Sequence, residues 1–175
     1  MILPQGYPAL IDHLNEIKGL NMIADIGNGT MNIMTLSNTK VDERKCYSEI
    51  LGVEKYKIAA NNAVLNKFGK NLDISIIEEF IRYGKASVPD HYNEVLKNVA
   101  LIYAKKIMET LYKYDYDPDF MTLYVIGGGH CLLKRYGNYV PGKTIFVEDI
   151  CAAAKGFEKA AEIKLAKDDD NEGAA

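Results

Sequence analysis

Residues 120–126 form a continuous apolar segment in which only Thr122 is polar, and Gly127, Gly128 and Gly129 follow it directly. A strand without a polar face is typical of a sheet that is covered by helices on both sides. Parallel strands in such sheets present ligands at their carboxyl ends. The segment therefore predicts an α/β fold with bare backbone at the end of a central strand. A tight strand-to-helix turn is the alternative explanation of the glycines.

A second glycine cluster, Gly27-Asn28-Gly29-Thr30, separates two segments of strand character at residues 22–26 and 31–37. Asn-Gly is the strongest two-residue signal for a β-hairpin, because both turn positions tolerate a positive φ. Backbone N–H groups in such a turn can approach a phosphate without interference from a Cβ atom. Thr30 adds a hydroxyl, and Asp25 at the strand end can face Mg²⁺ or its water. An ordinary hairpin with an incidental aspartate remains the alternative.

Hydrophobic periodicity and turn signals predict the remaining elements. We expect a short helix within residues 7–17, a strand at 41–50, helices at 51–68 and 74–83, a long helix from Ser87 to Tyr114, a helix at 130–136, a strand at 143–147 and a helix at 150–165. This order predicts a mixed sheet flanked by helices. We expect one domain over residues 1–166, with a small helical insert at about 70–88, and an acidic, disordered tail over 167–175.

Composition narrows the functional classes. Apolar residues make up 48% of the chain, which is enough for a proper core, and the formal net charge is −3. The lack of a basic block argues against direct nucleic-acid binding. Short apolar runs and the lack of a signal leader predict a cytoplasmic protein without membrane contact. Cys46, Cys131 and Cys151 are too scattered for a disulfide framework, and His130 beside Cys131 lacks further ligands at metal spacing.

The motifs D-I-G-N-G-T at residues 25–30 and L-Y-V-I-G-G-G-H at 123–130 resemble the second phosphate motif and the adenosine motif of the actin-like ATPase superfamily. Their spacing is similar to that of the superfamily's second domain, which has a ribonuclease-H-like fold. The ParM/StbA plasmid-segregation proteins are the most similar subfamily. That likeness lies in Pro4-Gln5-Gly6-Tyr7, Ile50-Leu51-Gly52-Val53 and Ala153-Ala154-Lys155-Gly156-Phe157. The resemblance extends to about residue 165.

The resemblance implies a role for each matching residue. Gly27, Asn28, Gly29 and Thr30 would hold the β- and γ-phosphates of ATP or ADP, and Asp25 would act in catalysis by positioning Mg²⁺ and its water. Gly127, Gly128 and Gly129 would lie along the adenosine and the α-phosphate. Gly52 would lie near the ribose, unless it is simply a helix-entry glycine. Base or ribose contacts would come from the insert, with Glu78, Glu79, Arg82 and Lys85 as candidates.

Two positions depart from the family pattern. Asn32 stands where relatives often have an acid, and His130 replaces the small residue that usually follows the three glycines. The first is expected to affect metal positioning or hydrolysis, and the second to alter the adenine pocket.

The resemblance covers only the second domain of a two-domain ATPase. The first domain would supply another phosphate loop and the residue that orients the attacking water, so this half alone is expected to hydrolyse ATP weakly or not at all. The implied function is the nucleotide-binding half of a ParM/StbA-like ATPase that polymerises and segregates plasmid DNA through an adaptor. Its partners would be other copies, the missing first domain and that adaptor. The alternatives are a non-enzymatic filament-docking or self-association module, and a fragment of a sugar kinase or heat-shock chaperone of the same superfamily.

Overall fold

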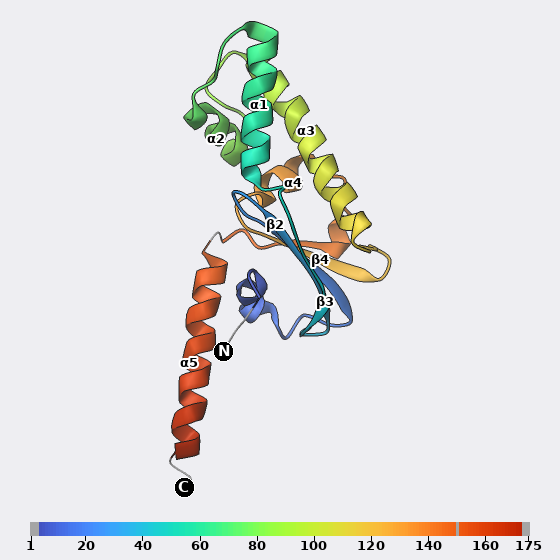
Figure 1. The fold of residues 1–175 in the computed structure, drawn as a ribbon, viewed down its shortest axis with the longest axis vertical. Coiled ribbons are helices and arrows are strands. Elements are labelled where there is room, and N and C mark those ends of the chain that lie inside the picture. Colours follow the sequence, from blue (N-terminus) through green and yellow to red (C-terminus); the bar gives the residue numbers. More distant parts are fainter. Residues whose placement is uncertain (1–3, 150, 173–175) are drawn as a thin grey trace.

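The computed structural model describes residues 4–149 and 151–172, and its centre is a five-stranded sheet in the order β3-β2-β1-β4-β5 (Figure 1). The sheet is mixed, because β1 pairs antiparallel with β2 and parallel with β4. The strands are β1 (Leu20–Ile26), β2 (Met31–Ser37), β3 (Lys40–Glu49), β4 (Met121–Ile126) and β5 (Thr144–Phe146). The mixed α/β sheet predicted from the sequence is confirmed.

Helices cover both faces of the sheet. One face carries α1 (Val53–Phe68), α2 (Ile74–Tyr83), α3 (Asp90–Lys113) and α4 (His130–Tyr136). The other face carries the 3₁₀ helix η1 (Tyr7–His13), and the last helix, α5 (Ala152–Glu172), packs on η1 and extends away from the sheet (Figure 1). A short 3₁₀ turn, η2 (Pro141–Lys143), leads into β5. The site described below lies where α1, α2 and α4 meet the ends of β1 and β4.

The side chains of the two central strands, β1 and β4, belong to two separate hydrophobic cores. Met22, Ala24 and Ile26 of β1 belong to the larger cluster beneath the helices, whereas Ile23 belongs to the smaller cluster that contains Leu10 of η1. Successive side chains of a strand point to opposite faces, so a strand covered on both sides must be apolar throughout. The segment before the three glycines obeys this rule, because its residues alternate between the same two clusters.

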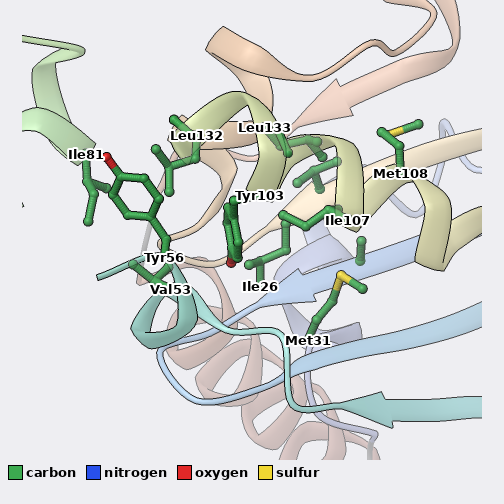
Figure 2. Packing of buried hydrophobic residues seen from close by; sticks show 14 of the residues in the cluster. Ile26, Met31, Val53, Tyr56, Ile81, Tyr103, Ile107, Met108, Leu132 and Leu133 are labelled. Carbon is green, nitrogen blue, oxygen red and sulfur yellow. The ribbon is translucent and has the colours of Figure 1, made fainter. Parts of the chain in front are cut away.

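Two buried tyrosines fix the start of α1 above the sheet. Tyr56 and Tyr103 lie with ring centroids 5.9 Å apart, in the packing that Figure 2 shows beside Val53. The Tyr103 hydroxyl donates to the carbonyl of Leu51 at 3.0 Å, and the Tyr56 hydroxyl donates to that of Leu96 at 3.2 Å. Burial raises the pKa of both phenols, so both stay neutral donors. The helix entry is therefore held rigidly against α3.

Several details differ from the sequence predictions. Helix α1 begins at Val53, because the preceding residues turn back toward the β1–β2 hairpin. The spacing of apolar residues along α3 predicts a buried stripe that includes Ile102, but Ile102 is 70% exposed, since the buried stripe of this helix runs through other positions. Helix α5 was expected to end near residue 165, yet its backbone remains helical to Glu172. Ile150 and residues 173–175 of the predicted tail lie outside the described residues.

Gly156 sets how closely α5 approaches η1. A Cβ atom at this position would lie 1.8 Å from the carbonyl oxygen of Pro8, so Gly156→Ala must push the two helices apart. We expect faster amide hydrogen exchange in α5 and η1, by about tenfold, with no change in the sheet. Gly142→Ala is the matched control, because no atom lies within 4 Å of its added Cβ. Equal exchange in the two variants would contradict this packing argument.

Candidate functional site

The two glycine clusters meet in one pocket of about 350 Å³. Gly27 and Asn28 reach it from the β1–β2 turn, and Gly128 reaches it from the turn after β4. The other walls come from three helices, with Val53 and Lys57 of α1, Glu78, Ile81 and Arg82 of α2, and His130 and Cys131 of α4. Because β1 and β4 are parallel neighbours, their carboxyl ends lie side by side, and the turns that follow them share one edge of the sheet.

The β1–β2 turn uses its carbonyl groups to hold the start of α1. The carbonyls of Gly27 and Asn28 accept from the first two N–H groups of α1, at 3.0 and 2.8 Å, and the carbonyl of Gly29 accepts from the N–H of Gly52, just before the helix, at 3.3 Å. These bonds satisfy donors that a helix N-terminus otherwise leaves open. No acceptor among the described residues meets the N–H groups of Asn28 and Gly29, and both residues are exposed. The turn therefore offers unused backbone donors, that of Asn28 on a residue that lines the pocket and that of Gly29 on its neighbour.

Each of the three glycines after β4 is a glycine for a different structural reason. Gly127 has a φ of +79°, and a Cβ there would lie 2.6 Å from the carbonyl oxygen of Ile26. A Cβ on Gly129 would lie 2.1 Å from the Ile26 Cγ2 atom. Gly128 is different, because nothing lies within 4 Å of its added Cβ and it faces the pocket. Packing thus explains Gly127 and Gly129, whereas only Gly128 leaves open space.

Gly52 and Thr30 support the turn and do not line the pocket. A Cβ on Gly52 would lie 2.3 Å from the carbonyl oxygen of Asn28, so the turn sits directly on this residue. The carbonyl of Thr30 accepts from the N–H of Gly27 at 2.9 Å and closes the hairpin. Gly52 is therefore required by the contact between α1 and the hairpin, and a ribose contact for it remains a prediction.

Asp25 lies behind the turns, on the η1 side of the sheet. The side chain is 9% exposed, and none of the described residues donates a hydrogen bond to it. Its two carboxylate oxygens lie against Gly127 and Gly6, whose added Cβ atoms would come within 2.7 and 3.1 Å. Burial raises the pKa of this carboxyl above its usual range. A largely buried carboxylate that accepts no hydrogen bond from the described residues is a natural position for a cation.

The insert helix α2 separates the four candidates named from the sequence. Glu78 and Arg82 line the pocket, and Glu78 accepts from Lys57 at 2.7 Å, which lowers the pKa of its carboxyl. Glu79 instead accepts from the hydroxyl of Ser87 at 2.6 Å. The sequence Ser87-Val88-Pro89-Asp90 is similar to a capping box, but the N-terminus of α3 has no side-chain cap. Lys85 pairs with Asp90 at 3.3 Å and lies away from the pocket.

Comparison with known proteins rests on structure alone, because no family model and no curated protein matches the sequence. An archaeal actin homolog, Ta0583, superimposes with a TM-score of 0.75 and 22% identity over 93% of this chain and 56% of its own. Its complex with ADP gives 0.70 and 21%, covering 93% and 57%. ParM of Bacillus thuringiensis with AMPPNP gives 0.65 and 15%, covering 85% and 48%. The chain has an actin-like fold.

The actin-like fold confirms the likeness to ParM-type proteins that the motifs predicted, at the level of the fold. The chain spans about half the length of these solved structures, between 48% and 57% for the three given above. None of the helices in the described residues is long and apolar enough to cross a membrane.

The actin-like domain also contains pocket residues that sequence reasoning missed. Lys57 lies one turn after Val53 on α1, so its position on the pocket face followed from helical spacing once the helix start was known. Ile81 is buried in the last turn of α2. Cys131 lines the pocket, although its sequence position beside His130 indicates only a metal ligand. Nothing in the sequence showed that Gly6 would lie against Asp25, since this contact joins two distant segments.

Proposed function

We propose that this domain binds a nucleoside di- or triphosphate, ATP or ADP, in the pocket between the two glycine turns. The observation that carries the proposal is the meeting of Gly27, Asn28 and Gly128 in one pocket with unused backbone donors. Similar solved structures contain ADP or AMPPNP, which supports the same class of ligand. Backbone N–H groups bind phosphates without a charged side chain, and bare glycine backbone admits them closely.

The ends of the pocket suggest an orientation for the nucleotide. The phosphates would lie at the β1–β2 turn, where Asn28 and Gly29 present their N–H groups. The sugar and base would then lie toward α2 and α4, where Ile81 supplies apolar surface and Glu78 and Arg82 supply polar groups. Gly128 lies between these ends with an open face, so a flat or anionic group can rest against its backbone.

Mg²⁺ fits the residues that are present. Asp25 is a buried carboxylate without a hydrogen-bond donor among the described residues, and it lies against the Gly127 turn. The described part of the chain contains no group of three or more side chains that could hold a metal. Mg²⁺ commonly binds through one carboxylate, water and substrate phosphates, which matches a single aspartate. Asp25 would orient the ion's water shell, and the ion would neutralise phosphate charge.

Hydrolysis and filament formation belong to the proposal for the intact protein. Phosphoryl transfer requires positioning and charge stabilisation around the phosphate, and the chain spans about half the length of the similar structures. We propose that this half alone hydrolyses ATP weakly or not at all. One similar structure is a ParM quadruple mutant described as non-polymerisable, at a TM-score of 0.73 and 16% identity. By analogy, we propose that the intact protein polymerises in the cytoplasm and segregates plasmid DNA through an adaptor.

Calorimetry with Mg-ATP and Mg-ADP tests the nucleotide proposal directly. We expect both nucleotides to bind the isolated chain, and free Mg²⁺ without nucleotide to give a much weaker signal. Adding inorganic triphosphate should compete with ATP, because the turn binds phosphate groups. No heat and no competition at millimolar nucleotide would overturn the proposal and favour a non-enzymatic docking module.

Arg82 and Lys85 form a matched pair for locating the base end. Both are exposed basic residues at the end of the insert, but only Arg82 lines the pocket. We expect Arg82→Ala to weaken nucleotide binding about fivefold, as for an exposed charge near a ligand, and Lys85→Ala to leave it unchanged. Isothermal titration of both variants measures the difference. An equal loss in both would mean that general surface charge, and not the pocket, attracts the nucleotide.

A further inference from the structure

A cysteine and a histidine form a hydrogen-bonded pair at the edge of the pocket. The Cys131 Sγ and His130 Nε2 atoms are 3.3 Å apart. The other ring nitrogen, Nδ1, is 2.8 Å from the carbonyl oxygen of Gly127. A carbonyl oxygen can only accept, so Nδ1 carries the proton and Nε2 presents its lone pair to the thiol. A nucleophile, a base and a group that orients the base are thereby aligned.

A second cavity, of about 480 Å³, is also lined by this pair. It shares Arg82, His130 and Cys131 with the nucleotide pocket and adds Lys134, Arg135, Tyr139 and Glu148. Lys134 pairs with Glu148, the only acidic residue in this lining, so the positive charges of Arg82 and Arg135 are not balanced there. The Arg135 guanidinium also donates to the carbonyls of Ile81 and Arg82, which holds it in place. The four added residues lie outside the lining of the pocket in which we place the nucleotide. The second cavity offers a cationic space of small-molecule size directly beside the thiol.

Cys131 is chemically distinct from the other two cysteines. It is partly exposed, whereas Cys46 and Cys151 are exposed. Cys46 lies near carboxylates: partial burial, with Asp42 and Glu43, raises the pKa of its thiol. Carboxylates beside a thiol make it a poor nucleophile and repel anionic reagents. A neighbouring base activates a thiol, and neighbouring cations attract anionic reagents to it. Cys46 and Cys151 therefore serve as internal controls for the reactivity of Cys131.

We propose that Cys131 is a site of reversible S-thiolation by an anionic low-molecular-weight disulfide, whose acidic half lies in the cavity lined by Arg82, Lys134 and Arg135. The Cys131 sulfur attacks one sulfur of the reagent, the reagent's S–S bond breaks, and a new S–S bond forms at Cys131. His130 Nε2 takes the thiol proton and returns it to the departing thiolate, so one free thiol is released. The adduct would block entry to the nucleotide pocket, a consequence that rests on the proposed function.

The test uses the wild-type chain with glutathione disulfide as the anionic probe and cystamine as the cationic probe. Peptide mapping by mass spectrometry follows the mixed disulfide at each of the three cysteines. We expect glutathione disulfide to modify Cys131 about tenfold faster than Cys46 or Cys151, despite their greater exposure. Cystamine should reverse the preference, slowing Cys131 and favouring Cys46 beside its carboxylates. A Cys131 rate no faster than the exposed thiols, or the same order with both probes, overturns the proposal.

His130→Gln tests the base, with His91→Gln on an exposed histidine as the matched control. We expect only the first to slow Cys131, with Cys46 unchanged in both variants. If His130→Gln also lost its fold, circular dichroism would show it, and the wild-type ranking would still decide the proposal.

Nucleotide binding by the free chain and by the Cys131 adduct distinguishes a failure of this proposal from a failure of the proposed function. Mg-ATP that binds the free chain but not the Cys131 adduct supports the regulatory role, and equal binding to both overturns it. A chain that binds no nucleotide but keeps the fast, anion-selective Cys131 overturns the proposed function and leaves the thiol assignment intact.

Discussion

Gly129→Ala is expected to destabilise the domain strongly, whereas Gly128→Ala leaves its stability unchanged. The added Cβ of the first variant would lie 2.1 Å from Ile26 Cγ2, in the core where β1 meets α1, and backbone φ at Gly129 is −77°, so only space is at issue. Overpacking of this kind costs about 3 kcal/mol, or about 10 °C in melting temperature for a domain of this size. Thermal denaturation by circular dichroism measures both variants.

Gly128→Ala instead tests the ligand. Its added Cβ meets no atom within 4 Å, and Gly128 is exposed at the pocket. A methyl group in the space where we place the nucleotide should weaken Mg-ATP binding about tenfold at unchanged melting temperature. Gly142→Ala is the control for an exposed glycine outside the pocket, since it too meets no atom within 4 Å. Unchanged affinity in Gly128→Ala would show that the nucleotide does not lie against this turn.

Asp25→Asn is expected to raise the stability of the free chain and to remove most of its affinity for Mg-nucleotide. Burial raises the pKa of Asp25, so folding disfavours the ionised carboxylate. This penalty is absent below the ordinary aspartate pKa of about 3.9 and grows as the pH rises through the folded-state pKa. The wild type should therefore be less stable than the variant at neutral pH, and the two should converge as the pH falls below that ordinary value.

Nucleotide should reverse this order. If Asp25 orients the water shell of Mg²⁺, its loss weakens Mg-nucleotide binding about 10- to 100-fold, as for other residues that act around a metal. Melting temperatures with and without Mg-ATP, across a pH series, measure both effects. Thr35→Val, at a buried polar position of β2, is a control for altered burial away from the turns. A variant that is less stable at neutral pH, or that binds Mg-ATP as the wild type does, contradicts the assigned role.

The sequence predicted the elements better than it predicted the orientation of side chains around the pocket. The hairpin between β1 and β2 and the buried strand before Gly127 follow from local sequence signals, and the structure contains both. The turn itself differs from the expected Asn-Gly type, because neither Asn28 nor Gly29 has a positive φ. Such rules could not decide which of the candidate residues in the insert faces the pocket. Glu78 and Glu79 are neighbours on one helix, and only the docking of α2 on the domain decides which one faces the pocket.

Long-range contacts account for the other gaps. Gly52 reads as a helix-entry glycine, and its contact with the carbonyl of Asn28 appears only when α1 is folded back onto the hairpin. The position of Asp25 opposite Gly6 likewise depends on the path of η1 beneath the sheet. The pairing of His130 with Cys131 required rotamers that a sequence pattern cannot supply.

The parallel pairing of β1 with β4 has a consequence for the order of folding. Asp25 pairs with Ile126, about a hundred residues later, and the N–H of Gly129 donates to the carbonyl of Ile26 at 3.0 Å. Closing so long a loop is entropically slow, so this pairing should form late and limit the folding rate. During synthesis, the hairpin would wait without its partner until β4 leaves the ribosome. A ligand of the completed pocket would then act mainly as a brake on unfolding, lengthening the lifetime of the native domain without hastening its formation.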